Sequence, residues 1–433
     1  MQWKGQCPGC GQWNTLEART QRSTPGRKAA ARAVTAAAPV PLSAPAPEGH
    51  GAFGCGLDAL DELLGKGLVP GATVLVAGEP GIGKSTLLLQ MAGGLAGAGR
   101  RAVYVSAEES LPQLRGRADR LGLLHDGLDA LDTTSCADAL AALEGPDAPD
   151  MLVVDSVQTM GADGGEGLPG SPGQVRAVAT ALSEAARRAG TALILVGHVT
   201  KDGQIAGPKL LEHMVDTVLS LEGDRRAAFR VLKVLKNRFG PSFEMLVFQM
   251  TGAGMEVVAD PSTFFLQDRD PSLPGTALVM GVSGQRPFAV EVQALVTQSV
   301  LGIPRRTALG FDANRLHLLL AVMEKQLRLS FGQVDIYAKI GGGLKLADPG
   351  LDLGIVAAVL SSFYDRPLPE MAALWGEVDL NGQVRPVHAH DIRARQAKRL
   401  GYKPVFHPAA ESGTGGCPTV AALQARLFGK GGG

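Results

Sequence analysis

The sequence lacks any uninterrupted apolar stretch close to the roughly 18 residues that a membrane-spanning helix needs. Its first residues, Met-Gln-Trp-Lys-Gly, also lack the apolar core of a signal peptide. The five cysteines are odd in number and scattered, which argues against a disulfide framework. These absences argue against a membrane protein and a disulfide-stapled secreted one, and they predict a cytoplasmic protein with no membrane partner.

Neither sign of charge is in excess, because 42 basic residues balance 42 acidic ones. A nucleic-acid-binding protein of this composition therefore needs a local basic patch. Residues 225–238 are a candidate, since they contain several basic residues and no acidic one. Charge alone leaves two interpretations open, a nucleic-acid contact or the solvated face of a strand. The basic residues are Arg225, Arg226, Arg230, Lys233, Lys236 and Arg238.

The length of 433 residues predicts two or three domains. Residues 17–50 are rich in Ala, Pro, Arg, Ser and Thr, a composition that is typical of a flexible linker. A second change of composition, to Gly, Pro and Ser, occurs at 271–285. We therefore expect a short cysteine-containing knuckle at 1–16, a linker at 17–50, and domains at 51–270 and 271–433.

The most informative motif is G-x-x-x-x-G-K-S at residues 78–85, the phosphate-binding P-loop. An apolar, strand-like run (73–77) precedes it and a helix-competent run (86–92) follows, so a chance glycine-rich turn is a poor explanation. Lys84 can reach the β- and γ-phosphates and the Ser85 hydroxyl can hold Mg²⁺. The motif predicts ATP and Mg²⁺ as ligands. The predicted nucleotide contacts are Gly78, Glu79, Pro80, Gly81, Ile82, Gly83, Lys84, Ser85 and Thr86.

Strand-like and helix-like segments alternate after the P-loop, which predicts an α/β domain with a mostly parallel sheet. Asp155 closes the strand-like run 151–154 and fits the carboxylate that supports Mg²⁺, although it could be an ordinary strand-ending residue. Glu108 and Glu109 follow the run 102–106, which we expect beside the P-loop strand. We assign Glu108 as catalytic base, because it is nearer the strand end. The alternative is an acid favoured by a helix N-terminus.

The order of these motifs resembles the RecA core. Two further segments, Lys-Asn-Arg-Phe-Gly at 236–240 and Gly-His-Val-Thr-Lys-Asp-Gly at 197–203, resemble the bacterial RadA (Sms) DNA repair family. That resemblance covers nearly the whole chain. It implies a ring-forming, DNA-stimulated ATPase, similar to hexameric helicases, that binds single-stranded and branched DNA. It also implies branch migration of recombination intermediates together with RecA.

The resemblance gives roles to four basic residues. In RecA-like rings, basic residues of one subunit reach the neighbour's γ-phosphate, and Lys236 and Arg238 fit that role. They could equally bind DNA phosphates, so both interpretations stay open. Lys201 and Lys209 lie in and beside a Gly- and Pro-containing segment that would face the ring channel and meet the DNA backbone.

Residues 281–296 and 376–387 resemble the proteolytic domain of the Lon family, which implies an S5-like α/β fold for the second domain. That family uses a serine nucleophile activated by a downstream lysine. Here Leu351 or Asp352 occupies the nucleophile position, and His-Ala-His-Asp at 388–391 replaces the lysine. We therefore expect a catalytically inactive domain that serves assembly and DNA binding. Candidates for its basic surface are Arg305, Arg306, Arg315, Lys345, Arg393, Arg395, Lys398 and Arg399.

Cys7 and Cys10 form one C-x-x-C pair. The RadA family carries two such pairs, which together make a four-cysteine zinc site. The first pair is absent here, so either the start is set too late or the finger is degenerate. Cys7 and Cys10 remain candidate zinc ligands. The other three cysteines, Cys55, Cys136 and Cys417, are expected to be buried packing residues.

Two alternative functions remain besides a DNA-dependent ATPase motor. One is a DNA-binding scaffold in which ATP only sets the assembly state. The other is an ATP-dependent protease, which the missing serine and lysine argue against.

Overall fold

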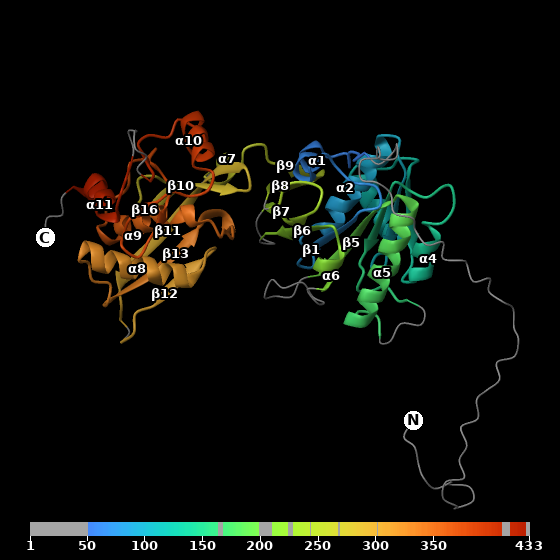
Figure 1. Cartoon of the computed structure of the whole chain (residues 1–433), viewed down its shortest axis with the longest axis horizontal. Coiled ribbons are helices and arrows are strands. Elements are labelled where there is room, and N and C mark those ends of the chain that lie inside the picture. Colours follow the sequence, from blue (N-terminus) through green and yellow to red (C-terminus); the bar gives the residue numbers. More distant parts are fainter. Residues whose placement is uncertain are drawn as a thin grey trace, which may run out of the picture. The chain divides into compact units, whose positions relative to one another are not determined.

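The computed structural model of the chain describes residues 51–162, 168–198, 210–223, 228–242, 244–266, 269–300, 302–408 and 416–429. The chain divides into two units, residues 1–48 and 49–433. The second unit contains two large β-sheets, each packed against helices (Figure 1). The predicted domain boundary at 270/271 falls between the last strand of one sheet and the first strand of the other, and it stays a prediction.

The first sheet is parallel over six strands, in the order β3-β2-β4-β5-β1-β6, and continues antiparallel through β7, β8 and β9. Its central strands are apolar and buried throughout, as expected for strands covered on both faces. The bounds are β1 (Thr73–Gly78), β2 (Ala102–Ser106), β3 (Leu128–Asp132), β4 (Met151–Asp155), β5 (Ala192–His198), β6 (Thr217–Glu222), β7 (Phe229–Asn237), β8 (Met245–Thr251) and β9 (Gly254–Val257).

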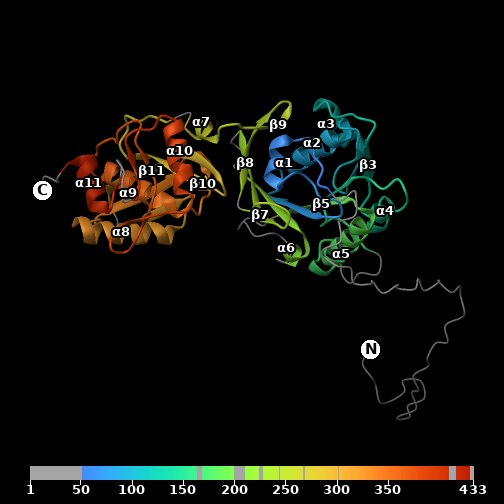
Figure 2. The same cartoon turned by 45° about the horizontal axis from the view of Figure 1, so that its top comes forward.

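Helices cover both faces of this sheet. Successive side chains of each strand point to opposite faces, so they pack in two different cores. Val74 and Val76 of β1 pack in one core, while Leu75 packs in the other. The first core also receives α1, α2 and α3, and the second receives α4, α5 and α6 (Figure 2). The bounds are α1 (Asp58–Leu64), α2 (Lys84–Gly97), α3 (Leu111–Arg120), α4 (Cys136–Ala141), α5 (Pro172–Ala189) and α6 (Leu210–Met214).

The strand order corrects one expectation. The strand before Glu108, β2, does not lie beside β1, because β4 and β5 stand between them. It pairs in parallel with β4 instead, with Ser106 opposite Asp155. Since parallel strands end at the same edge, the ends of β1, β2 and β4 nevertheless lie along one edge of the sheet.

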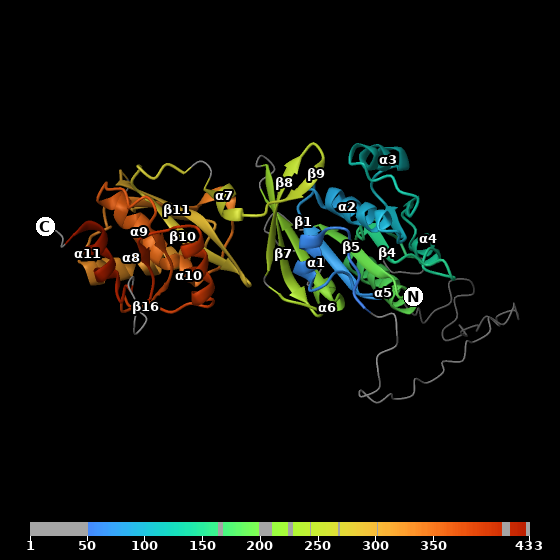
Figure 3. The same cartoon turned by 90° about the horizontal axis from the view of Figure 1, so that it is seen from above.

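The second sheet has the order β12-β13-β11-β10-β14-β17, and β15 and β16 form a separate small hairpin. Helix α9 is almost wholly buried against this sheet, with Asp352 to Ser361 all inaccessible (Figure 3). The strands are β10 (Thr276–Ser283), β11 (Arg286–Gln298), β12 (Arg306–Leu309), β13 (Val334–Ile340), β14 (Ala373–Leu374), β15 (Glu377–Val378), β16 (Val384–Arg385) and β17 (Val405–Phe406). The helices are α7 (Pro261–Phe265), which precedes this sheet, α8 (Ala313–Leu327), α9 (Asp352–Phe363), α10 (His390–Arg399) and α11 (Val420–Phe428), with short 3₁₀ turns at Gly341–Gly343 and Pro349–Leu351.

Two simpler expectations concern cysteines and membranes. Cys55, Cys136 and Cys417 are free thiols and all buried, as predicted. Burial raises the pKa of the Cys417 thiol to about 11, which makes it a poor nucleophile. Among the helices that the structure describes, none combines the length and the apolar character needed to cross a bilayer.

Candidate ATP site

The P-loop connects β1 to α2 and depends on two glycines with positive φ. Gly81 has φ +76° and Gly83 has φ +114°, a region that L side chains rarely adopt. Lys84 begins α2 and is only 4% exposed. Its Nζ donates to the carbonyl oxygens of Gly78 at 2.8 Å and Glu79 at 3.0 Å. The lysine is therefore held at the mouth of the loop that the motif predicts for phosphates.

Asp155 ends β4 and lies at the same edge. It is 8% exposed, and its Oδ2 accepts a hydrogen bond of 2.6 Å from the Tyr104 hydroxyl. Burial raises the pKa of Tyr104, and the negative charge of Asp155 raises it further, while a hydrogen bond with Ser85 lowers it. Tyr104 thus connects the two predicted Mg²⁺ ligands, Ser85 and Asp155. Sequence reasoning missed Tyr104, because it occupies a buried strand position that reads as ordinary core.

The two glutamates after β2 have different partners. Glu108 accepts a hydrogen bond of 2.6 Å from the hydroxyl of Ser156, the residue that follows Asp155. Glu109 instead forms an ion pair of 2.6 Å with Arg117 on α3. The structure therefore brings Glu108, and not Glu109, toward Asp155. This geometry agrees with the choice of Glu108 as base, although that role stays a prediction.

Electrostatics join these groups into one site. Burial lowers the pKa of Lys84, and the carboxylates of Asp155 and Glu108 oppose that shift. Both carboxylates therefore lie near enough to the ammonium group to interact with it. Lys84, Asp155 and Glu108 come from three different segments of the chain, yet they share one edge of the sheet.

The oxygen atoms at this site suit Mg²⁺. A hydroxyl and a carboxylate are hard donors, and Mg²⁺ in nucleotide sites takes only one or two such protein ligands beside the phosphates. Ser85 and Asp155 supply that set. Over the residues that the structure describes, no group of three or more His, Cys, Asp or Glu side chains is placed to hold a metal ion.

Lys236 and Arg238 lie elsewhere. The Nζ of Lys236 donates to the carbonyls of Glu212 at 2.8 Å and Val215 at 2.7 Å, at the C-terminal end of α6. Arg238 forms an ion pair of 3.1 Å with Asp216, which also accepts the backbone N–H of Thr73. Thr73 begins β1, whereas the P-loop follows its end, about 16 Å away along the strand. Within this chain, these two cations therefore do not meet Lys84.

Four predicted residues cannot be placed. Lys201 and Lys209, the candidate DNA contacts, and Cys7 and Cys10, the candidate zinc ligands, lie outside the described residues.

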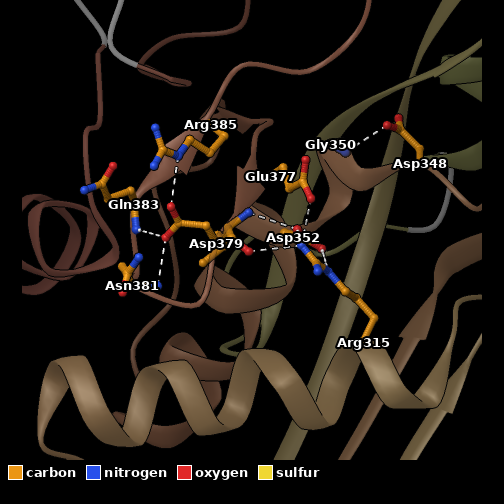
Figure 4. A network of polar contacts seen from close by, with 10 residues as sticks. Arg315, Asp348, Gly350, Asp352, Glu377, Asp379, Asn381, Gln383 and Arg385 are labelled. Atoms are coloured by element: carbon orange, nitrogen blue, oxygen red, sulfur yellow. Dashed lines mark hydrogen bonds and ion pairs between the residues drawn. The ribbon is translucent and has the colours of Figure 1, made fainter.

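Asp352, one of the two residues expected at the Lon-like nucleophile position, belongs to a network of charged and polar side chains (Figure 4). Asp352 is 1% exposed; its Oδ1 accepts 2.9 Å from Arg315 Nε, and its Oδ2 accepts 2.9 Å from the Val378 N–H. Glu377 lies 3.6 Å from the same guanidinium. Burial raises the pKa of Asp352, and Arg315 opposes that rise. The carboxylate is thus fully engaged with its neighbours.

The proposed basic surface of the second domain needs correction at two positions. Arg393 is 2% exposed and forms a two-pronged ion pair with Asp348, at 2.8 and 2.9 Å. It also donates to the Met280 carbonyl. Arg315 is neutralised by Asp352. The sequence could not reveal this, because each acidic partner is distant along the chain.

Comparison with known proteins identifies the family. An AAA domain model matches residues 50–204, the part of the chain that holds the P-loop, Glu108 and Asp155. A protein named DNA repair protein RadA from Bacillus subtilis is 42% identical over 411 residues, covering 94% of this chain and 90% of that protein. The chain belongs to the RadA family. Other RadA proteins agree, from Halalkalibacterium halodurans (41% identical, 94% of this chain and 89% of that protein) and Mycobacterium tuberculosis H37Rv (41%, 94% and 85%). The predicted resemblance to RadA is therefore confirmed.

Glu108→Gln is predicted to lower the turnover number for ATP hydrolysis by about 10²–10⁴-fold, because the amide cannot accept a proton from water. ATP affinity should change little. The matched control is Glu109→Gln, which loses an ion pair with Arg117 but should keep most activity. Steady-state ATPase rates measure both variants. Equal losses in the two would contradict the assignment.

Proposed function

We propose that this chain is a DNA-dependent ATPase of recombinational DNA repair, which acts in the cytoplasm on single-stranded and branched DNA. In this proposal it promotes branch migration of recombination intermediates together with RecA. The observation that carries the ATPase part of the proposal is the convergence of Lys84, Asp155 and Glu108 on one sheet edge. Membership of the RadA family supports the repair role.

The chain's own groups then have defined tasks. Bound MgATP supplies the phosphoanhydride bond and the metal charge. Lys84 exchanges its two neutral carbonyl partners for phosphate oxygens, a stronger charge-assisted contact. Ser85 and Asp155 hold the metal, with Tyr104 fixing the carboxylate orientation. Glu108 accepts the proton of the attacking water while Ser156 keeps its side chain in place.

Lys236 and Arg238 act between subunits in this proposal. They lie at the end of β1 opposite the P-loop, so a contact with a γ-phosphate has to be made in a neighbouring subunit. Arg238 remains 61% exposed by side chain despite its ion pair, so its guanidinium has donors to offer. A ring, which we propose to be a homo-hexamer, supplies such neighbours. Contact of Arg238 with DNA phosphates is the alternative use of the same group.

In this proposal Lys201 and Lys209 contact DNA, through a sequence-independent electrostatic attraction to its phosphates. Lys236 binds the carbonyls at the end of α6, the helix that begins at Leu210, directly after Lys209. A DNA-induced shift of α6 would therefore change these contacts of Lys236. Zinc binding by Cys7 and Cys10 is retained as a further proposal, testable by metal content of purified protein.

Lys84→Ala is predicted to lower the rate of ATP hydrolysis by at least about 10²-fold, because no cation then stabilises the negative charge of the transition state. Hydrolysis by the unmodified protein should rise with added single-stranded DNA. The measurement is ATPase rate with and without DNA for both proteins. Tight DNA binding by the unmodified protein without any hydrolysis would favour the scaffold alternative, as would normal branch migration by Lys84→Ala.

Lys236→Ala is predicted to leave ATP affinity within about threefold and to impair DNA-coupled activity, since the P-loop is not its neighbour. Lys325→Ala, at an exposed position on α8, is a matched control. Branch migration of a labelled three-strand intermediate provides the readout. Normal remodelling by Lys236→Ala would show that the coupling role is wrong.

The second domain is proposed to be inactive as a protease. Asp352 has no hydroxyl, its carboxylate is held by Arg315, and no lysine occurs at 388–391. Purified protein with ATP and DNA should leave fluorescent casein intact over hours. Asp352→Ser should be inactive too, because no lysine would activate the new hydroxyl. ATP-dependent casein degradation that survives further purification would refute the proposal.

A further inference from the structure

A buried arginine on β7 contacts the P-loop. Arg230 is 6% exposed, and its Nε donates to the carbonyl oxygen of Ile82 at 2.8 Å, across 148 residues of sequence. Its Nη1 donates to the carbonyl of Phe229 at 2.6 Å. Burying a guanidinium costs free energy unless its N–H donors are hydrogen-bonded. A buried arginine that donates to a P-loop carbonyl therefore suggests a specific role at the loop.

The bonded carbonyl belongs to the peptide group that joins Ile82 to Gly83. In a planar trans peptide, the C=O and N–H bonds point in opposite directions. When Arg230 holds the Ile82 oxygen on the β7 side, the Gly83 N–H is turned to the opposite side. In a P-loop, such N–H groups face the phosphates. The orientation of one phosphate-binding donor is thereby fixed from outside the loop.

Gly83 is the residue for which such support matters most. Its φ of +114° is accessible to glycine, which also has the greatest freedom to leave that conformation. Gly83 is also the residue directly before α2, so its N–H lies where the helix begins. A loop that relies on glycine for its shape needs an external contact to remain in that shape.

A glycine at position 223 leaves the space that the Arg230 side chain occupies. Gly223, at φ +153°, precedes β7 in the chain, and a Cβ at that position would lie 3.0 Å from Arg230 Cδ and 2.9 Å from the Phe229 oxygen. A larger residue there would displace the arginine. Lysine could not replace it fully, because the Nε and Nη1 donors reach two carbonyls in a fixed fork.

We propose that Arg230 is a positioning residue that fixes the Ile82–Gly83 peptide so that the Gly83 N–H faces the nucleotide phosphates. It is not a catalytic residue, since it acts through the backbone. The inference rests on the proposed ATPase function and deepens it. It also gives Arg230 a different role from either interpretation of the basic segment 225–238, a nucleic-acid contact or a solvated strand face.

The test compares Arg230→Gln and Arg230→Lys, with Arg176→Gln on the exposed face of α5 as the control. Binding of a fluorescent ATP analogue with Mg²⁺ gives the affinity, and ATPase assays give KM and kcat. Arg230→Gln should weaken binding by about 10–100-fold, the loss expected for one charge-assisted bond. The loss should appear in KM more than in kcat, because the phosphates are bound before and during reaction. Arg230→Lys should be intermediate.

A merely structural arginine gives a different result. Thermal unfolding would then shift and the active fraction would fall, while the folded fraction would keep its affinity. The proposal is overturned if Arg230→Gln protein binds MgATP as tightly as the unmodified chain. If Arg230→Gln does not fold, unchanged affinity of Arg230→Lys for MgATP overturns it instead. Unmodified protein that binds but does not hydrolyse MgATP refutes only the proposed function. Unmodified protein that does not bind MgATP refutes both.

Discussion

The geometry of the site depends on the parallel alignment of β1, β4 and β2. Parallel strands bring all their carboxyl ends to one edge, so segments distant in sequence meet there without long loops. The P-loop follows β1, Asp155 ends β4, and Glu108 comes two residues after β2. The register places Ser106 opposite Asp155, and the Ala107 N–H then donates to the Asp155 carbonyl. Each of these contacts would be lost if one strand shifted by a single residue.

The charges at that edge are arranged around Asp155. Its carboxylate receives the Tyr104 hydroxyl and lies within electrostatic reach of Lys84. Buried charges of opposite sign reduce one another's desolvation cost, provided that their remaining lone pairs and protons are hydrogen-bonded. The arrangement brings the buried side chains of Asp155 and Lys84 to the same edge of the sheet. A site of this kind is prepared for a ligand that itself carries both negative charge and a metal.

Much of this can be predicted from local sequence, and the rest cannot for identifiable reasons. The P-loop is contiguous, so its strand, turn and helix are predictable, and the run 151–154 with Asp155 at its end coincides with β4. Strand order is not local, and the expectation of β2 beside β1 is wrong. No expectation from the sequence covers β8 and β9, which extend the sheet on its antiparallel side. Tyr104 and Arg393 have polar atoms that find partners only through the fold.

The ion pair between partly exposed Arg315 and buried Asp352 has a consequence for how this protein can change over evolution. Removing Arg315 leaves Asp352 as a buried charge without its cationic partner, at a cost of about 3–5 kcal/mol, which is a large part of a typical domain's stability. Removing Asp352 costs less, because the Arg315 side chain is 29% exposed and lies 3.6 Å from Glu377. Replacing both together by apolar residues carries no such penalty. Replacement of Arg315 alone is thus opposed by selection for folding. The order of replacement therefore matters, and a change at residue 352 is tolerated more readily before a change at residue 315 than after it.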